Sequence, residues 1–109
     1  MSDNVTSADL GQLSHGLFLE LLNSKFSIKG FTAEPIELEL IEVSKLQQSR
    51  RQEAFSIQFR GPASPLLAQR CYPLEHPKLG SSELFLVPIG QDSQGVYYEA
   101  VFNRLIPST

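Results

Sequence analysis

The chain has 109 residues and a mass of 12.1 kDa, enough for one domain whose folding buries about two thirds of the surface of the unfolded chain. Its net charge of -3, with 41% hydrophobic and 19% charged residues, is ordinary for a globular protein and argues against a nucleic-acid partner held by phosphate neutralisation. We therefore expect a single domain over residues 1–109, with residues 1–6 and 104–109 peripheral to it.

Cysteine content and hydropathy bear on the cellular compartment of the protein. Cys71 is the single cysteine, so an intrachain disulfide and a thiolate zinc cluster are both excluded. With no histidine pattern beside it, we expect Cys71 to be a buried small hydrophobe and not a nucleophile. The N-terminus carries acids before any base, and every apolar run is far shorter than the ~18 residues of a membrane span. We expect a cytoplasmic protein without cofactor, membrane or nucleic-acid partner.

The first predicted element is a short helix within residues 7–23. Its apolar residues recur at three- and four-residue steps, which is a helical period. They are Leu10, Leu13, Leu17, Phe18, Leu21 and Leu22. Ser7, Asp9 and Ser14 are candidate N-caps, and Asn23 is a candidate stop. Two glycines disfavour one long helix, so we expect a short one ending near Leu22, alone or after a separate turn.

Beyond the helix the apolar period changes to two. Phe26 and Ile28 alternate with polar neighbours until Gly30, which predicts a first strand. A second strand is predicted over residues 36–44. Within it the apolar phase slips after Leu40, and such a slip is typical of a β-bulge or of a strand bent at a barrel corner.

The middle of the chain holds a polar segment and a regular strand. Residues 45–52 are polar and predict a solvated hairpin tip, which we favour over an anion site. Phe55, Ile57 and Phe59 then alternate with more polar neighbours and predict a half-buried third strand that stops at Gly61.

Residues 62–75 carry the candidate interaction surface. Leu66 and Leu67 form an apolar pair in a loop that either folds back onto the core or marks a contact surface. A further strand is predicted over residues 69–75. Pro73 within it cannot donate a ladder hydrogen bond and so indicates a sheet edge or a bulge. Because an edge beside an apolar loop suits docking, we expect Leu66, Leu67 and Pro73 to contact a protein partner.

The last predicted unit is a β-hairpin over residues 82–103. Two apolar runs flank a polar loop with Gly90 and Gly95 at its ends, which predicts a longer, mobile connection. The first run is apolar on both faces between Leu84 and Ile89, so we expect a central strand packed on each side. The second run alternates, and its predicted core face comprises Val96, Tyr98, Ala100 and Phe102. The opposite face of that run could be surface or line a groove.

Together these elements predict an all-β fold. About six strands with short links follow a short N-terminal helix, and no βαβ alternation occurs, so a parallel sheet is disfavoured. We expect a small antiparallel barrel or a rolled sheet, organised around the hairpin of residues 82–103.

Four sequence blocks carry a resemblance to a known family. They are FSIQFRGP at residues 55–62, YPLEHPKLG at 72–80, ELFLVPIG at 83–90 and YEAVFN at 98–103. In this order and spacing they resemble a family of small bacterial proteins classed as a domain of unknown function, over most of residues 14–103. The resemblance implies a similar size and offers no catalytic or ligand residues to transfer. It also implies an association with phage-tail-collar-like proteins, whose genes lie beside those of the family.

Few side chains are candidates for catalysis or for metal or anion binding. Glu75, His76 and Glu99 have the groups of an acid/base pair or of a partial metal shell, but nothing in their spacing supports either, and we favour structural roles. Arg60 could hold a carboxylate or a phosphate through two hydrogen bonds. We favour instead an ion pair with a neighbouring acid such as Glu99. We expect no catalytic residue and no metal site.

Two function hypotheses follow. The first is a non-catalytic protein-interaction or structural module that binds a protein partner or a second copy of itself and is associated with phage-tail-like proteins. The second is a small-molecule binder or an enzyme whose polar barrel mouth is lined by Arg60, His76, Tyr97 and Glu99. A pocket that gathers these four side chains would favour the second hypothesis.

Overall fold

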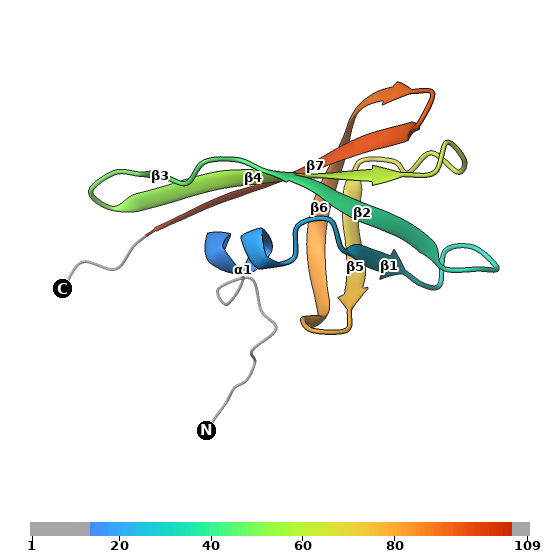
Figure 1. Cartoon of the computed structure of the whole chain (residues 1–109), viewed down its shortest axis with the longest axis horizontal. Coiled ribbons are helices and arrows are strands. Elements are labelled where there is room, and N and C mark those ends of the chain that lie inside the picture. Colours follow the sequence, from blue (N-terminus) through green and yellow to red (C-terminus); the bar gives the residue numbers. More distant parts are fainter. Residues whose placement is uncertain (1–13, 106–109) are drawn as a thin grey trace.

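The computed structural model describes residues 14–105 and places one helix before seven strands in that part of the chain (Figure 1). In chain order the elements are α1 (His15–Glu20), β1 (Lys25–Ile28), β2 (Ile36–Val43), β3 (Gln47–Gln48), β4 (Gln52–Gly61), β5 (Arg70–His76), β6 (Gly80–Asp92) and β7 (Gly95–Leu105). The prediction of an all-β fold with a short N-terminal helix is confirmed.

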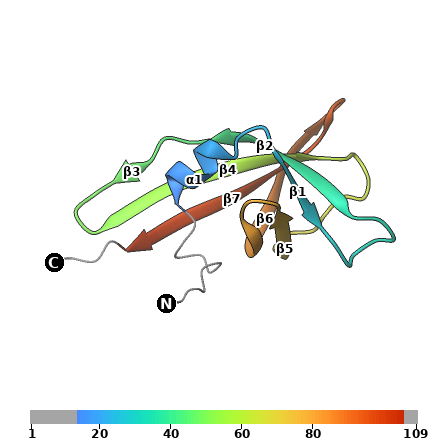
Figure 2. The ribbon, with the colours of Figure 1, turned by 60° about the horizontal axis from the view of Figure 1, so that its bottom comes forward.

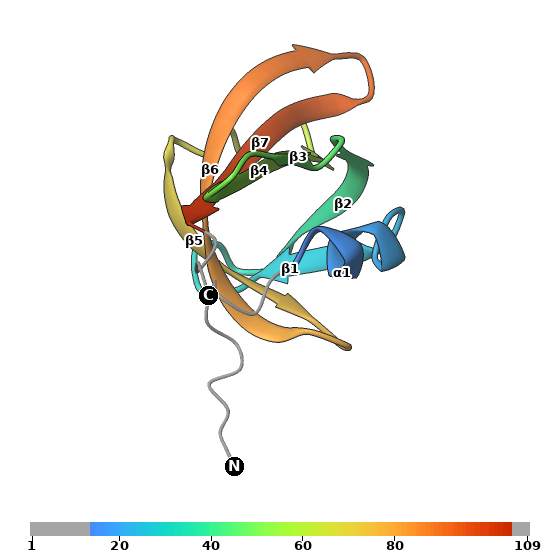
Figure 3. The same ribbon diagram turned by 90° about the vertical axis from the view of Figure 1, so that its left-hand side faces the viewer.

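Six of these strands close into an antiparallel barrel. Neighbouring strands follow the order β2-β1-β5-β6-β7-β4, and a further pairing of β2 with β4 closes the ring. Figure 3 shows the strands curving around a common interior. Closure leaves fewer free strand edges than an open sheet has. The short β3 adds to β4 outside the ring, and with β4 and β7 it forms an arm that extends beyond the barrel (Figure 2).

The core fills the barrel interior with alternate residues of each strand, as the period of two requires. The predicted core face of β7 is confirmed, since Val96, Tyr98, Ala100 and Phe102 are all buried. The core also includes Phe26, Ile28, Leu38, Leu40, Phe55, Ile57, Phe59, Leu74, Leu84 and Leu86. In β4 the alternation predicted a half-buried strand, and the structure shows one.

Helix α1 covers the arm from the core side. Phe18 is fully buried, and its ring lies 6.1 Å from Phe55 and 5.3 Å from Phe102. Ser14 is the N-cap, because its side chain accepts a hydrogen bond from the N–H of Leu17. The other two candidate caps lie outside the described residues. Asn23 has a φ of 72°, a left-handed conformation that asparagine tolerates better than most residues, and it ends the segment as expected.

The phase slip in β2 is a change of partner strand. β2 pairs with β1 up to Glu39 and with β4 from Glu39 onward, and the register against β4 shifts between Leu40 and Glu42. Ile41 is the extra residue, so the following side chains change faces. The predicted bulge or barrel corner is therefore confirmed.

The hairpin of residues 82–103 differs from its prediction in two ways. Only one face of β6 is packed: Leu86 is fully buried, whereas Phe85 is 49% exposed and Ile89 is 45% exposed. The outer face stays open because the described elements form a single layer around the core. The connection is also short, since β6 continues to Asp92 and β7 begins at Gly95.

Two smaller expectations, the burial of Cys71 and the peripheral position of residues 104–105, also differ from the structure. Cys71 is exposed and not buried, because it points outward from β5 between the buried Tyr72 and the exposed Arg70. Arg104 and Leu105 are not peripheral, because β7 extends to Leu105. Arg104 forms an ion pair with Glu53 of β4, with Nε and Oε1 3.1 Å apart.

Candidate functional site

Three connections meet at one end of the barrel, where β1 and β4 finish and β2 and β5 begin. They are residues 29–35, residues 62–69 and the turn at residues 93–94, and all three lie on the right in Figure 1. We term this the loop end. Members of all three connections border an open groove of about 810 Å³, together with outward-facing residues of β1, β2 and β4. The loop end therefore presents a wide, open concave surface.

Two buried tyrosines fix the backbone of the connection between β4 and β5. The N–H of Leu67 donates to the hydroxyl of Tyr98 at 2.9 Å, and the hydroxyl of Tyr72 donates to the carbonyl of Ala68 at 2.6 Å. Both rings are almost fully buried. Burial raises the pKa of Tyr72, so its hydroxyl stays protonated and able to donate at neutral pH.

This fixation separates the two leucines that the sequence left as a pair. Leu67 is only 6% exposed and belongs to the core, while Leu66 is 63% exposed. The expectation that Leu67 lies on a contact surface is therefore wrong, because its own backbone N–H is bonded to a hydroxyl inside the barrel. Leu66 remains as an apolar side chain presented outward.

An aromatic and a cationic side chain add to the loop end. The guanidinium of Arg70 lies over the rings of Phe31 and Tyr72, 5.3 and 5.7 Å from their centroids. Phe31 packs on Tyr72 with a centroid distance of 5.1 Å and is still 42% exposed. Such cation–π contacts contribute about 0.5 to 1 kcal/mol each at exposed sites. Phe31 and Leu66 thus expose apolar surface from two of the three connections.

A polar network joins the turn at residues 93–94 to the strands beneath it. Arg60 binds Glu39 with 2.7 Å between Nη2 and Oε1 and donates to Gln94 at 3.2 Å. The hydroxyl of Tyr97 donates to Asp92 at 2.8 Å, and Asp92 also accepts the N–H of Gln94 at 2.8 Å. The Glu39 hydrogen bond raises the pKa of Arg60, whereas the N–H of Gln94, then the Tyr97 hydroxyl, lowers that of Asp92. The groups satisfy one another, which favours a structural role.

The structure does not bring the four predicted pocket residues together. Arg60 borders the loop-end groove, His76 borders a separate hollow beside the β5–β6 turn, and Glu99 borders a third hollow on the outer face of β4 and β7. Tyr97 lies opposite Arg60 in the ladder of β4 with β7. The acid that binds Arg60 is Glu39 and not the expected Glu99, because β4 lies between β2 and β7 and its Arg60 turns toward β2.

His76 is held by structural contacts. Its Nδ1 accepts the N–H of Lys78 at 3.0 Å, so its Nε2 carries the proton toward the hydroxyl of Ser24 at 2.9 Å. Its ring packs on Phe26 with 4.7 Å between centroids. Burial, and to a smaller extent the charge of Lys78, lowers the pKa of His76. Glu75 beside it forms an ion pair with Lys29 at 3.1 Å.

Pro73 lies where one side of β5 has lost its neighbour. β5 lies between β1 and β6 in the ring, but its pairing with β1 is short and is centred on Ser27 opposite Glu75. Continuing this antiparallel register places Pro73 beyond the end of β1 at Ile28. The residue without an N–H thus occupies a local edge within a closed barrel, which is a tolerated position for proline.

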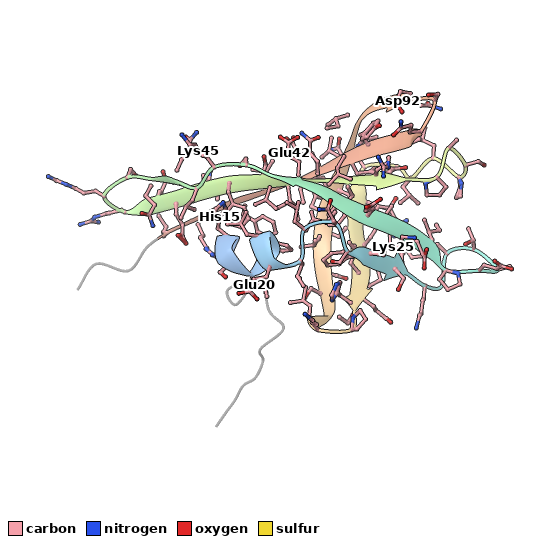
Figure 4. The ribbon with its side chains drawn as sticks, viewed as in Figure 1. His15, Glu20, Lys25, Glu42, Lys45 and Asp92 are labelled. Atoms are coloured by element: carbon pink, nitrogen blue, oxygen red, sulfur yellow. The ribbon has the colours of Figure 1, made fainter. Side chains whose placement is uncertain are left out.

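Acidic and histidine side chains are dispersed over the molecule. Figure 4 shows Asp92 at the tip of the β6–β7 hairpin, far from His15 and Glu20 on α1. Among residues 14–105, no group of three or more His, Cys, Asp and Glu side chains could hold a metal ion. In the same part of the chain, the one helix is too short to cross a membrane.

Sequence reasoning missed Phe31, Arg70, Tyr72 and Tyr98 as determinants of the loop end. One signal was present: Tyr98 stands on a predicted core face, and a buried tyrosine hydroxyl needs a hydrogen-bond partner. The sequence offered no means of naming that partner, because Leu67 lies 31 residues away.

The fold and the loop end define a small antiparallel β-barrel that presents an exposed apolar residue, Leu66, at one end. The family model described as "Domain of unknown function (DUF6916)" matches residues 13–102, and the chain belongs to this family. The resemblance noted in the sequence is thereby confirmed. A search of curated proteins found no match, and neither did a search of solved structures.

Proposed function

We propose that this protein is a non-catalytic interaction module that binds a protein partner through the loop end. The observation that carries this proposal is the fixed outward position of Leu66, which is 63% exposed while the N–H of the next residue is tied to Tyr98. A backbone already held in one conformation loses little entropy on binding. Phe31 exposes further apolar surface at the same end of the barrel, and exposed apolar surface of this kind can mark an interaction site.

The chemistry around Leu66 supports the same proposal. Phe31 and Arg70 belong to residue types that are enriched in interfaces, and both are exposed at the loop end. The adjacent groove is wide and open, and its two cations, Lys25 and Arg60, are already paired with acids. The alternative of a small-molecule site has less support, because His76 and Glu99 lie at separate hollows away from Arg60 and Tyr97.

We place the partner among phage-tail-collar-like proteins of the same bacterium, in the cytoplasm. The support for this partner is the gene association implied by the family resemblance, and a lone cysteine fits a reducing compartment. The partner would be a protein encoded beside this chain. Its docking site would offer an apolar pocket for Leu66.

The test is a binding measurement with the purified collar-like protein encoded next to this chain. Leu66→Ser should weaken binding at least tenfold, about 1.4 kcal/mol, because it replaces the anchor with a polar group. Leu19→Ser is the matched control, since Leu19 is 48% exposed but lies on α1, and it should bind like the wild type. Thermal melts establish that both variants fold.

Three outcomes would contradict the proposal. If Leu66→Ser folds and binds like the wild type, the loop end is not the docking surface. If both leucine variants weaken binding equally, the contact involves general apolar exposure and not the fixed residue. If the wild-type chain binds none of the neighbouring gene products, the assignment of the partner is wrong.

A further inference from the structure

The C-terminal half of β7 has a strand neighbour on one side only within residues 14–105. β4 pairs with it along its whole length. β6 pairs with β7 only as far as the position where Val87 lies opposite Glu99. From Leu86 back to Gly80 its pairing is with β5, on its other edge. Figure 2 shows β7 running away from β6 beyond this point. Residues 100–105 therefore present an open edge.

The backbone of such an edge is a template for another strand. Within residues 100–105, every second residue directs its N–H and C=O groups to the open side. The N–H and C=O groups of the residues between them point to β4. Unpaired edges of this kind are commonly blocked by proline, lysine or a short strand length. Residues 100–105 read AVFNRL and contain neither proline nor lysine. The one cation, Arg104, is paired with Glu53 of β4.

The side chains at this edge supply an independent observation. Leu105 at 75% and Val101 at 65% are the two most exposed large hydrophobic side chains of the described residues. Both lie on the outer face of β7, with the exposed Asn103 midway between them. The exposed apolar groups are therefore placed symmetrically about one residue.

We propose that β7 pairs antiparallel with β7 of a second copy of this chain, around a two-fold axis at Asn103. In this register Val101 lies opposite the partner's Leu105, so each covers the other, and the two Asn103 side chains face each other across the axis. A two-fold interface must be complementary to itself, and this edge is. The result is one continuous sheet through β4 and β7 of both copies. The proposal goes beyond the proposed function, because the edge lies at the opposite end of the barrel from the loop end.

Sedimentation or light scattering of the full chain tests the pairing. The wild type should be a dimer that dissociates on dilution. Val101→Lys should raise the dimer dissociation constant at least tenfold, because it places an ammonium against an apolar side chain. Leu66→Lys is the matched control at an equally exposed leucine, and it should leave the dimer unchanged. A wild-type chain that is monomeric at all concentrations would overturn the proposal.

Cross-linking tests the register in a Cys71→Ser background, which removes the native thiol. Residues directly opposite in an antiparallel pair have Cβ atoms about 4.5 to 5.5 Å apart, close to disulfide distance. Asn103→Cys should therefore form an intermolecular disulfide on oxidation. Val101→Cys alone should not, since four residues, about 14 Å, would separate it from its own copy. A mixture of Val101→Cys and Leu105→Cys chains should cross-link.

The cross-links also decide between occupants of the edge. A dimer in which Asn103→Cys fails to cross-link uses another surface, and preferential cross-linking of Val101→Cys means another register; either result overturns the proposal. A monomer whose amides at residues 100–105 resist hydrogen exchange would mean that a segment of the same chain covers the edge. Leu66→Ser separates this test from the proposed function, because it should weaken partner binding and leave the dimer intact.

Discussion

The N–H of Leu67 donates a hydrogen bond of 2.9 Å to the hydroxyl of Tyr98, 31 residues later in the chain. Tyr98 is 1% exposed, so this bond lies inside the barrel. It commits Leu67 to the core and leaves Leu66 on the surface. The candidate interaction surface therefore depends on a hydroxyl in the core, and this dependence leads to the first prediction.

Tyr98→Phe should lower the free energy of unfolding by about 1 to 3 kcal/mol, because it leaves the N–H of Leu67 buried and unpaired. Chemical denaturation measures this loss. Tyr97→Phe is the control: its hydroxyl bonds Asp92 at an exposed position, so its loss should cost much less. Equal losses in the two variants would show that the Leu67 bond does not fix the connection.

Neighbouring residues of β6 should differ sharply in their contribution to stability. Leu86→Ala removes a fully buried side chain and should cost about 2 to 5 kcal/mol. Phe85→Ala removes a larger side chain that is 49% exposed, and it should cost clearly less. Urea denaturation of both variants checks the order. The reverse order would mean that the outer face of β6 is covered in solution.

The turn into β7 should tolerate no side chain at Gly95. This residue has a φ of 147°, and a Cβ built on it would lie 2.1 Å from the carbonyl oxygen of Gly61. Gly95→Ala should therefore cost more than about 1 kcal/mol, since the obstacle is backbone. Gly90→Ala is the matched control, with nothing within 4 Å of its Cβ. Thermal melts of the two variants should differ by several degrees, and similar melts would exclude the close approach.

The stability of the protein should fall below neutral pH through His76. Burial holds the pKa of His76 below its ordinary 6.5 in the folded chain. At a pH between the lowered pKa of the folded chain and the ordinary pKa of the unfolded chain, the unfolded state therefore binds the proton more readily. The free energy of unfolding then decreases as the pH falls below about 6.5. His76→Gln removes the titrating group. The slope of stability against pH from 7.5 to 5.5 should be shallower in this variant, and identical slopes would contradict the assignment.

Removal of metal should leave the melting temperature unchanged, because no complete ligand set occurs among residues 14–105. Melts with and without an excess of EDTA check this. A drop of several degrees on chelation, restored by a divalent cation, would show a metal site that the described residues do not reveal.

Much of the fold could be read from the sequence. The positions of the six barrel strands, the short helix and the bulge after Leu40 follow from the local period of apolar residues, because alternation places Phe55, Ile57 and Phe59 on one face in any sheet. The short β3 was not predicted, since Gln47 and Gln48 lie in a polar segment without such a period. The candidate site was less predictable. Arg60 was expected to bind an acid, but its partner Glu39 is set by which strand lies beside β4.

The sequence by itself determined the class of this protein: a small all-β domain with a short first helix, belonging to a family of domains of unknown function. The tertiary structure alone decided three things: the closure of the ring, the exposure of Phe85, and which of Leu66 and Leu67 faces inward. The physical reason is that periodicity records only which side chains share a face. Whether that face is covered, and which polar group meets which, depends on residues far away in the chain, as the bond between Leu67 and Tyr98 shows.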